Sequence, residues 1–361
     1  VDIDGAVDMA TTLAVAGNVD FNGDLDVDGT TNLDIVDVDG AVNFAADVTF
    51  ADGADIITAS AGTSNFRAGV NAGNSIASGG NYNVAVGDEA GTAITTGDNN
   101  VFIGYTAGDA VTAASDNIGI GYNALGGANT GAENVAIGSN ALDANTSGVS
   151  NTAMGYNALG ANTTGSYNIG IGQSAGGAIT TGQKNTLMGF GAGDATTTAD
   201  NNTAVGYDAL TANTTGTRNV AVGALALDAN TTASNNNAVG YSAMSANTTG
   251  AGNQAFGDSA LAANTTAANN TAMGNFAMSA NTTGFDNVAV GAIALDANTT
   301  GNSNTAVGYG SLSADTLGDR AVAIGKNALI AQNFTSTTDN YNTAVGYGTG
   351  AAVTTGVNNT L

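Results

Sequence analysis

The chain of 361 residues is built on a repeat of fixed length. A short motif, Asn-x-small-apolar-Gly, recurs with its glycine at steps of 17 residues from Gly87 to Gly325, and a further copy follows at Gly346 after a step of 21. The residue before the glycine is apolar in all 16 copies. A disordered polar chain has no reason to keep an apolar position in strict register, so the pattern predicts a repeat fold rather than low-complexity disorder.

The length of the repeat restricts the architecture. Helical repeats need about 33 residues or more, so a 17-residue unit favours one coil of an all-β solenoid. We interpret residues 304–309 as a first strand and residues 157–159 as the start of a second strand. Residues 162–165 then form a turn in which Gly165 supplies a positive φ. Because stacked coils rise about 4.8 Å each, 16 coils predict a rod of about 75 Å.

Two positions of the repeat vary together. Four residues after the glycine, most copies carry Leu or Met, as at Leu159 and Leu210, and the others carry a second glycine. Four of the five copies with the second glycine place an apolar residue three positions later, as at Ile94 and Ile179, and the fifth has Thr196, where the Leu and Met copies mostly have Asn. A void and an overfilled core are both costly, so this exchange predicts one interior slot that is filled once per coil.

An asparagine stands four residues before the glycine in 15 of the 16 copies. In stacked coils, identical residues lie about 4.8 Å apart, so their amides can hydrogen-bond along the stack. We therefore predict a structural role, as a ladder, for this asparagine column and its glycines. The representative positions are Asn134, Asn151, Asn202, Asn219, Gly138, Gly155, Gly206 and Gly223.

Residues 1–60 carry a different repeat of about 12 residues, in which apolar residues alternate with aspartate before a glycine. Such alternation predicts strands with one wet face, and a lone strand cannot bury its apolar face. We expect three chains to wind together here as a β-strand shaft. Residues 24–29 match the start of a calcium loop, but Ile35 stands where a glutamate ligand belongs, so calcium is an alternative to plain strand alternation.

Composition excludes several classes of function. The chain has no Cys and no His, which removes a thiol nucleophile, a histidine base and the common zinc sites. Five basic residues against 30 acidic ones give a net charge of −25, which argues against nucleic-acid partners. No run of 18 apolar residues occurs, so we expect no membrane insertion. We predict no enzyme, no catalytic residue, no resident cofactor and no metal ligand apart from the calcium alternative.

The repeat resembles two groups of fibrous proteins. Residues 134–138 and 287–291 are similar to the signature of the left-handed parallel β-roll head of trimeric autotransporter adhesins. Residues 151–165 resemble repeats of phage tail-fibre proteins, and the Asp-rich residues 18–40 resemble the shafts of such fibres. The resemblance implies a homotrimer at a surface, made of a shaft over residues 1–60 and a roll of 17-residue coils over residues 61–361, with a longer coil at 326–346.

The resulting functional hypothesis is a non-catalytic, acidic extracellular fibre. A phage tail fibre that attaches the virion to its host is preferred, and a bacterial cell-surface adhesin is the alternative. A polysaccharide depolymerase is more remote, because the aspartates that recur five residues after the glycine, such as Asp143 and Asp228, suggest a solvated rim. An ice-binding solenoid is also more remote, because adjacent threonines should point apart.

Receptor contacts are expected where the repeat breaks. The longer coil inserts four residues, and a loop that leaves the roll can carry Phe334, Tyr341 and Asp339 outward toward a host glycan or protein. A lip that caps the roll, or a bracket between chains, is the structural alternative. A stripe of tyrosines just after the glycine, such as Tyr105 and Tyr309, is expected to pack between chains of the trimer.

Overall fold

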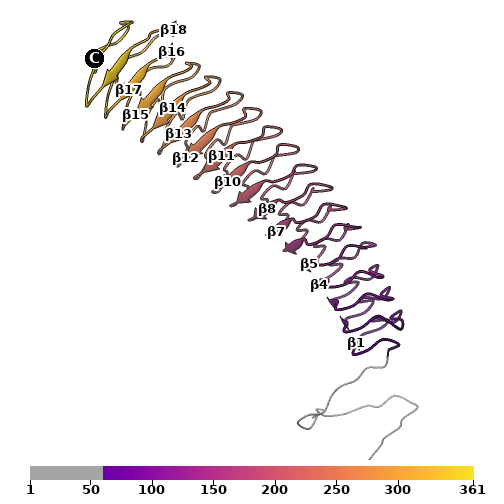
Figure 1. Ribbon diagram of the computed structural model, residues 1–361. Coiled ribbons are helices and arrows are strands. Elements are labelled where there is room, and N and C mark those ends of the chain that lie inside the picture. Colours follow the sequence, from indigo (N-terminus) through magenta and orange to yellow (C-terminus); the bar gives the residue numbers. More distant parts are fainter. Residues whose placement is uncertain (1–59) are drawn as a thin grey trace, which may run out of the picture. The chain divides into compact units, whose positions relative to one another are not determined.

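The computed structural model describes residues 60–361, so the predicted shaft and its calcium alternative lie outside the described residues. The described chain is an all-β parallel solenoid without helices, which confirms the fold class. Its coils stack one on the next from β1 to β17 in Figure 1. The strands are β1 (Phe66–Ala68), β2 (Val84–Val86), β3 (Val101–Ile103), β4 (Ile118–Ile120), β5 (Val135–Ile137), β6 (Thr152–Met154), β7 (Ile169–Ile171), β8 (Thr186–Met188), β9 (Thr203–Val205), β10 (Val220–Val222), β11 (Asn237–Val239), β12 (Gln254–Phe256), β13 (Thr271–Met273), β14 (Val288–Val290), β15 (Thr305–Val307), β16 (Gly318–Asp319), β17 (Val322–Ile324), β18 (Thr338–Asp339) and β19 (Thr343–Val345).

One strand from every coil joins a single 17-stranded parallel sheet. The register is constant, so that Ala221 of β10 faces Ala204 of β9 and Ala238 of β11. The middle residue of each strand points into the roll and its two neighbours point outward, as the half-buried Val220 and Val222 show. Period-2 geometry thus places one residue in the core and two on an outer sheet face in every coil.

Each coil contributes one strand to this sheet, and the prediction of a second strand is wrong. Asn157 and Leu159 have positive φ angles of 54° and 49°, so they form a turn instead. The predicted turn glycine, Gly165, does not have a positive φ. Glycine is needed there because a Cβ would lie 2.3 Å from the carbonyl oxygen of Gly182 in the next coil. The positive φ falls on the repeat glycine, at 133° in Gly155.

The core is a stack of alternating small and large side chains. Alanines fill most positions, and Leu or Met four residues after the repeat glycine fills the remaining space, as Leu210 does. In the coils with a second glycine, the predicted residues Ile94 and Ile179 are fully buried, and a Cβ on Gly91 or Gly176 would lie 2.7 Å or 3.0 Å from their side chains. Strand residues also fill this space in two such coils, where Phe102 approaches Gly108 and Leu187 approaches Gly193. A Cβ on Gly108 would lie 2.5 Å from the Phe102 ring. Filling the slot once per coil keeps the interior close-packed.

The asparagines four residues before the repeat glycine form a buried column, which we call the first asparagine column. The backbone N–H of Asn219 donates to Oδ1 of Asn202 at 2.9 Å, and Nδ2 of Asn219 donates to the carbonyl of Ala233 at 2.9 Å. Asn151 makes the same pair of contacts, to Asn134 and Gly165. The column therefore ties neighbouring coils together and closes each coil on itself, in an interior where an unpaired polar group is costly.

Candidate functional site

The longer coil forms a small sheet with the coil before it. Strand β16 pairs in parallel with β18, so that Gly318 faces Thr338 and Asp319 faces Asp339. This two-stranded sheet is separate from the main sheet of the roll. The residues that the longer coil inserts therefore form an ordered ledge, and the pairing brings residues 319–320 beside residues 339–341.

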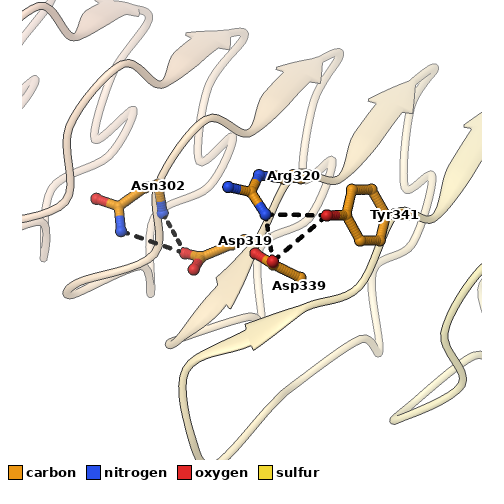
Figure 2. Close-up of polar contacts among 5 residues, drawn as sticks. All are labelled: Asn302, Asp319, Arg320, Asp339 and Tyr341. Atoms are coloured by element: carbon orange, nitrogen blue, oxygen red, sulfur yellow. Dashed lines mark hydrogen bonds and ion pairs between the residues drawn. The ribbon is translucent and has the colours of Figure 1, made fainter.

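Three side chains meet on this ledge, as Figure 2 shows. Arg320 forms an ion pair with Asp339, and its Nη1 donates to Oη of Tyr341 at 3.0 Å. The guanidinium carbon lies 5.6 Å from the centre of the Tyr341 ring. The Asp339 carboxylate raises the pKa of Arg320 further above its usual value. About half of each side chain is exposed, so the ledge offers a cation, a carboxylate and an aromatic ring to solvent.

Asp319 fixes the base of the ledge. Its Oδ1 accepts the backbone N–H of Asn302 at 2.6 Å and the side-chain amide of Asn302 at 3.4 Å. Asp319 is almost fully buried, unlike Asp339 directly opposite it. The two aspartates that face each other across the small sheet thus have different roles, since one anchors the strand and the other is presented to solvent.

The structure corrects one predicted receptor contact. Phe334 is only 5 % exposed, so it cannot reach a partner outside the roll. Its backbone N–H donates to Oδ1 of Asp315 at 3.2 Å, and its carbonyl accepts the hydroxyl of Thr316 at 3.1 Å. These contacts hold residue 334 against the preceding coil. Tyr341 and Asp339 are exposed and remain candidate contacts.

The second candidate surface is the outer sheet face, made of the first and third residues of every strand of the main sheet. The third residue is apolar in every coil from β2 to β19, and the first is Val, Ile or Thr in most of them. Several of these side chains are exposed beyond a third of their surface despite their apolar character. They are Phe66, Ile103, Met154, Ile169, Met188, Phe256, Met273, Ile324 and Val345.

The tyrosine stripe borders this face and is solvent-exposed along the single chain. Tyr105 and Tyr122 stack with ring centres 5.9 Å apart, and Phe190 and Tyr207 stack at 5.5 Å. The ammonium group of Lys326 lies 5.6 Å from the Tyr309 ring and 6.0 Å from the Tyr347 ring. The members of the stripe are Tyr105, Tyr122, Tyr156, Tyr207, Tyr241, Tyr309 and Tyr347, all more than half exposed.

The recurrent aspartates are less solvated than a rim would be. Burial raises the pKa of Asp109, Asp143, Asp194, Asp228 and Asp296 above the usual aspartate value. The negative charge of Asp208 raises the pKa of Asp194 and Asp228 further. Because the arrangement repeats from coil to coil, it does not single out one pair of carboxylates for acid–base chemistry.

Sequence reasoning missed a second interior ladder. The asparagines seven residues after the repeat glycine, read from the sequence as turn residues, are fully buried. The amide Nδ2 of Asn281 donates to Oδ1 of Asn264 at 3.1 Å and to the carbonyl of Gly284 at 2.9 Å. Asp315 and, in the longer coil, Gln332 continue the same column. The signal was present in the sequence, since these asparagines recur at a fixed place in most of the coils whose core is filled by Leu or Met.

Within residues 60–361, no group of three or more acidic side chains is arranged to hold a metal ion. In the same part of the chain, no helix has the length and apolar character needed to cross a membrane. Comparison of the chain with models of protein families, with curated protein sequences and with solved structures gives no match.

Proposed function

We propose that the chain is a non-catalytic segment of a trimeric extracellular fibre, with a phage tail fibre for host attachment as the preferred reading and a bacterial surface adhesin as the alternative. The observation that supports this most is the outer sheet face. Every coil presents an apolar residue there, and the apolar stripe runs along the whole described roll. Exposed apolar stripes of this extent are typical of interfaces between chains.

Three copies of the chain would cover these faces against one another. Chains cannot associate by pairing the edges of these strands, because every strand of the main sheet from β2 to β17 already pairs on both sides within its own chain. Association through the outer face needs no new backbone pairing and buries valine, isoleucine and methionine side chains at about 25 cal/mol per Å². The tyrosine stripe borders the same face and would line its rim.

Host contact is proposed at the ledge of the longer coil. Arg320, Asp339 and Tyr341 combine a charge-assisted donor, an acceptor and an aromatic face, which together suit sugar hydroxyls or a polar protein surface. Three identical ledges on one rigid rod would gain affinity through effective concentration. In this mechanism, the roll supplies reach and stiffness rather than turnover.

Light scattering on a sizing column tests the assembly. The full chain should elute as an elongated particle with three times the chain mass of 34.8 kDa. Val222→Glu places a charge on the outer sheet face and should give monomers. Thr215→Glu places the same charge on an exposed position elsewhere and should remain trimeric. A wild-type chain that runs as a monomer would overturn the trimer.

Binding to an array of bacterial surface polysaccharides tests the ledge. Arg320→Ala and Tyr341→Ala should each lower the retained signal by about tenfold, the loss expected for one good polar or aromatic contact. Arg218→Ala serves as the control, because Arg218 is also exposed but lies away from the ledge. The side-chain contact described for Arg218 is a hydrogen bond to Asn235 of the neighbouring coil. Equal binding by all three variants would remove the ledge from the proposal.

A further inference from the structure

The buried asparagines seven residues after the repeat glycine form a second asparagine column, and the hydrogen bonds along this ladder all run in one direction. In each of its uninterrupted stretches, Nδ2 of one coil donates to Oδ1 of the coil before it, as from Asn264 to Asn247 at 2.7 Å and from Asn298 to Asn281 at 2.8 Å. Among the described residues, an asparagine oxygen of the ladder is therefore satisfied only when the following coil supplies an N–H donor at this position. The rule predicts an unpartnered asparagine oxygen wherever the next residue of the column cannot donate.

Two asparagine oxygens of the ladder among the described residues lack a donor, and both obey this rule. Oγ1 of Thr196, in the same column, also lacks a partner, because Nδ2 of the following Asn213 donates to the carbonyl of Gly216 instead. Oδ1 of Asn162 is buried without a partner, and the next residue of the column is Ile179. Oδ1 of Asn298 is buried without a partner, and the next residue is Asp315. An isoleucine can never donate a hydrogen bond. An aspartate can do so, but only when its carboxyl group carries a proton.

Asp315 is also the point where the longer coil attaches to the coil before it. The side chain is fully buried, and its Oδ2 accepts Nε2 of Gln332 at 2.6 Å. Its Oδ1 accepts the backbone N–H of Phe334 at 3.2 Å and that of Gly318 at 3.1 Å. Gln332 in turn accepts from Nδ2 of Asn342 through its Oε1 at 2.8 Å. One carboxyl group thus connects its own coil to the longer coil and, through Gln332, to Asn342.

We propose that Asp315 is protonated in the folded chain at neutral pH, and that this proton is donated to Oδ1 of Asn298 to complete the ladder and seat the longer coil. The acid remains able to accept from Gln332, Phe334 and Gly318, since a protonated carboxyl group keeps acceptor capacity on both oxygens. Asp315 is then a positioning residue for the ledge, which stands on the same coils.

The electrostatic surroundings agree with this assignment. Burial raises the pKa of Asp315, and the hydrogen bonds from Gln332 and the backbone only partly oppose the rise. No charged side chain contributes to the shift. The charged groups nearest along its own coil and the next are otherwise engaged, Asp319 with Asn302 and Arg320 with Asp339.

The assignment makes the stability of the longer coil depend on pH. A carboxyl group whose pKa is raised on folding stabilises the fold fully below the ordinary aspartate pKa of about 3.9, and this contribution is lost as the pH rises through the raised value. The coil that carries the ledge should therefore loosen toward alkaline pH. This inference stands apart from the proposed function, because it concerns the seating of the coil and not what the ledge binds.

Infrared spectroscopy of the full chain at pH 7 tests the proton directly. The wild-type minus Asp315→Asn difference spectrum should contain the carbonyl band of a protonated carboxyl group, and this band should vanish at alkaline pH. A difference spectrum with carboxylate bands alone at pH 7 would overturn the proposal. If the variant does not fold, carbon-13 NMR of aspartate carboxyl groups in the wild-type chain decides, because the proposal fails if every aspartate is ionised at pH 7.

Melting curves provide the second readout. Asp315→Asn gives Asn298 a permanent donor but loses one of the two acceptor oxygens at every pH, so the pH dependence of the melting temperature is the diagnostic quantity. Relative to the wild type, the melting temperature of the variant should be about 2–4 °C higher at pH 8 than at pH 4, where Asp315 is protonated. Ile179→Asn is the matched control at the other gap of the ladder, and its effect should not change with pH. A variant that melts below the wild type at pH 8 but not at pH 4 would show that the ionised carboxylate is needed.

Discussion

Oδ1 of Asn340 accepts the backbone N–H of Asn342 at 2.9 Å and so replaces a missing member of the first asparagine column. In regular coils, the asparagine of the preceding coil accepts this N–H, as Asn202 does for Asn219. Ala321 occupies that place before Asn342 and has no side-chain oxygen. The longer coil thus supplies from its own residues the acceptor that the repeat would otherwise provide.

The substitution Asn340→Ala should destabilise the longer coil. It leaves the buried N–H of Asn342 without an acceptor, which costs about 1–3 kcal/mol. Chemical denaturation together with hydrogen exchange at the Asn342 amide measures the loss. Adding Ala321→Asn restores the regular acceptor and should recover part of it. An unchanged exchange rate at Asn342 would contradict this account of the column.

The repeat glycine should tolerate no side chain. Gly206 has a φ of 141°, and a Cβ there would lie 2.6 Å from the carbonyl carbon and oxygen of Gly223. Gly206→Ala should therefore cost about 3 kcal/mol or more, because both the backbone and the stacking distance must change. Gly348→Ala is the control, since nothing lies within 4 Å of its added Cβ and φ is 61°. It should cost about 1–2 kcal/mol, and similar denaturation midpoints for the two variants would refute the steric explanation.

The interior slot can be tested by exchanging its filling. Leu187→Ala should leave a cavity and cost about 2–5 kcal/mol. Gly193→Leu alone should overpack the coil, since even a Cβ would lie 2.8 Å from Leu187. The double variant recreates the usual pattern, in which a leucine such as Leu210 adopts a φ of 57°. A double-mutant cycle measured by denaturation should show the double variant to be more stable than the sum predicts, and simple additivity would argue against a shared slot.

The roll as a whole should be more stable in mild acid than at neutral pH. The five recurrent aspartates have pKa values raised chiefly by burial, so their protonated forms favour the folded state. Their contribution is full below the ordinary aspartate pKa and disappears as the pH rises through the raised values. Asp228→Asn should raise the melting temperature at pH 7 and reduce its fall between pH 4 and pH 7. Asp286→Asn, at an exposed position, should change this slope less.

The repeat period was sufficient to predict the solenoid, because only a coil of strands and turns closes within 17 residues and repeats its apolar positions. The exchange of Leu for Gly likewise pointed to a packed interior. The local geometry was harder to predict. Asn157 and Leu159 were read as a strand, yet both adopt positive φ, which the identity of a leucine does not suggest. In this conformation the backbone N–H of Leu159 donates to the carbonyl of Ala175 in the next coil at 3.0 Å, a contact that a single repeat does not reveal.

The candidate surface was predicted only in part. The break in the repeat located the longer coil, and Asp339 and Tyr341 are on its exposed side. Phe334 was wrongly predicted to face outward, because β18 of the longer coil pairs with β16 of the coil before it, and the ring is buried. Arg320 was not singled out, since its partner lies 19 residues away in the sequence. The pairing of two short strands brings Arg320 and Asp339 together, and such pairing depends on the inserted length rather than on residue type.

The constant register between strands has a consequence for how such a chain can change its length. Each coil meets the next through the same backbone pairs, as β9 meets β10 and β10 meets β11. Removing or duplicating any 17-residue block within the regular coils therefore joins surfaces that already fit. Recombination between repeats can therefore lengthen or shorten the rod one coil at a time while the backbone pairing between coils stays the same.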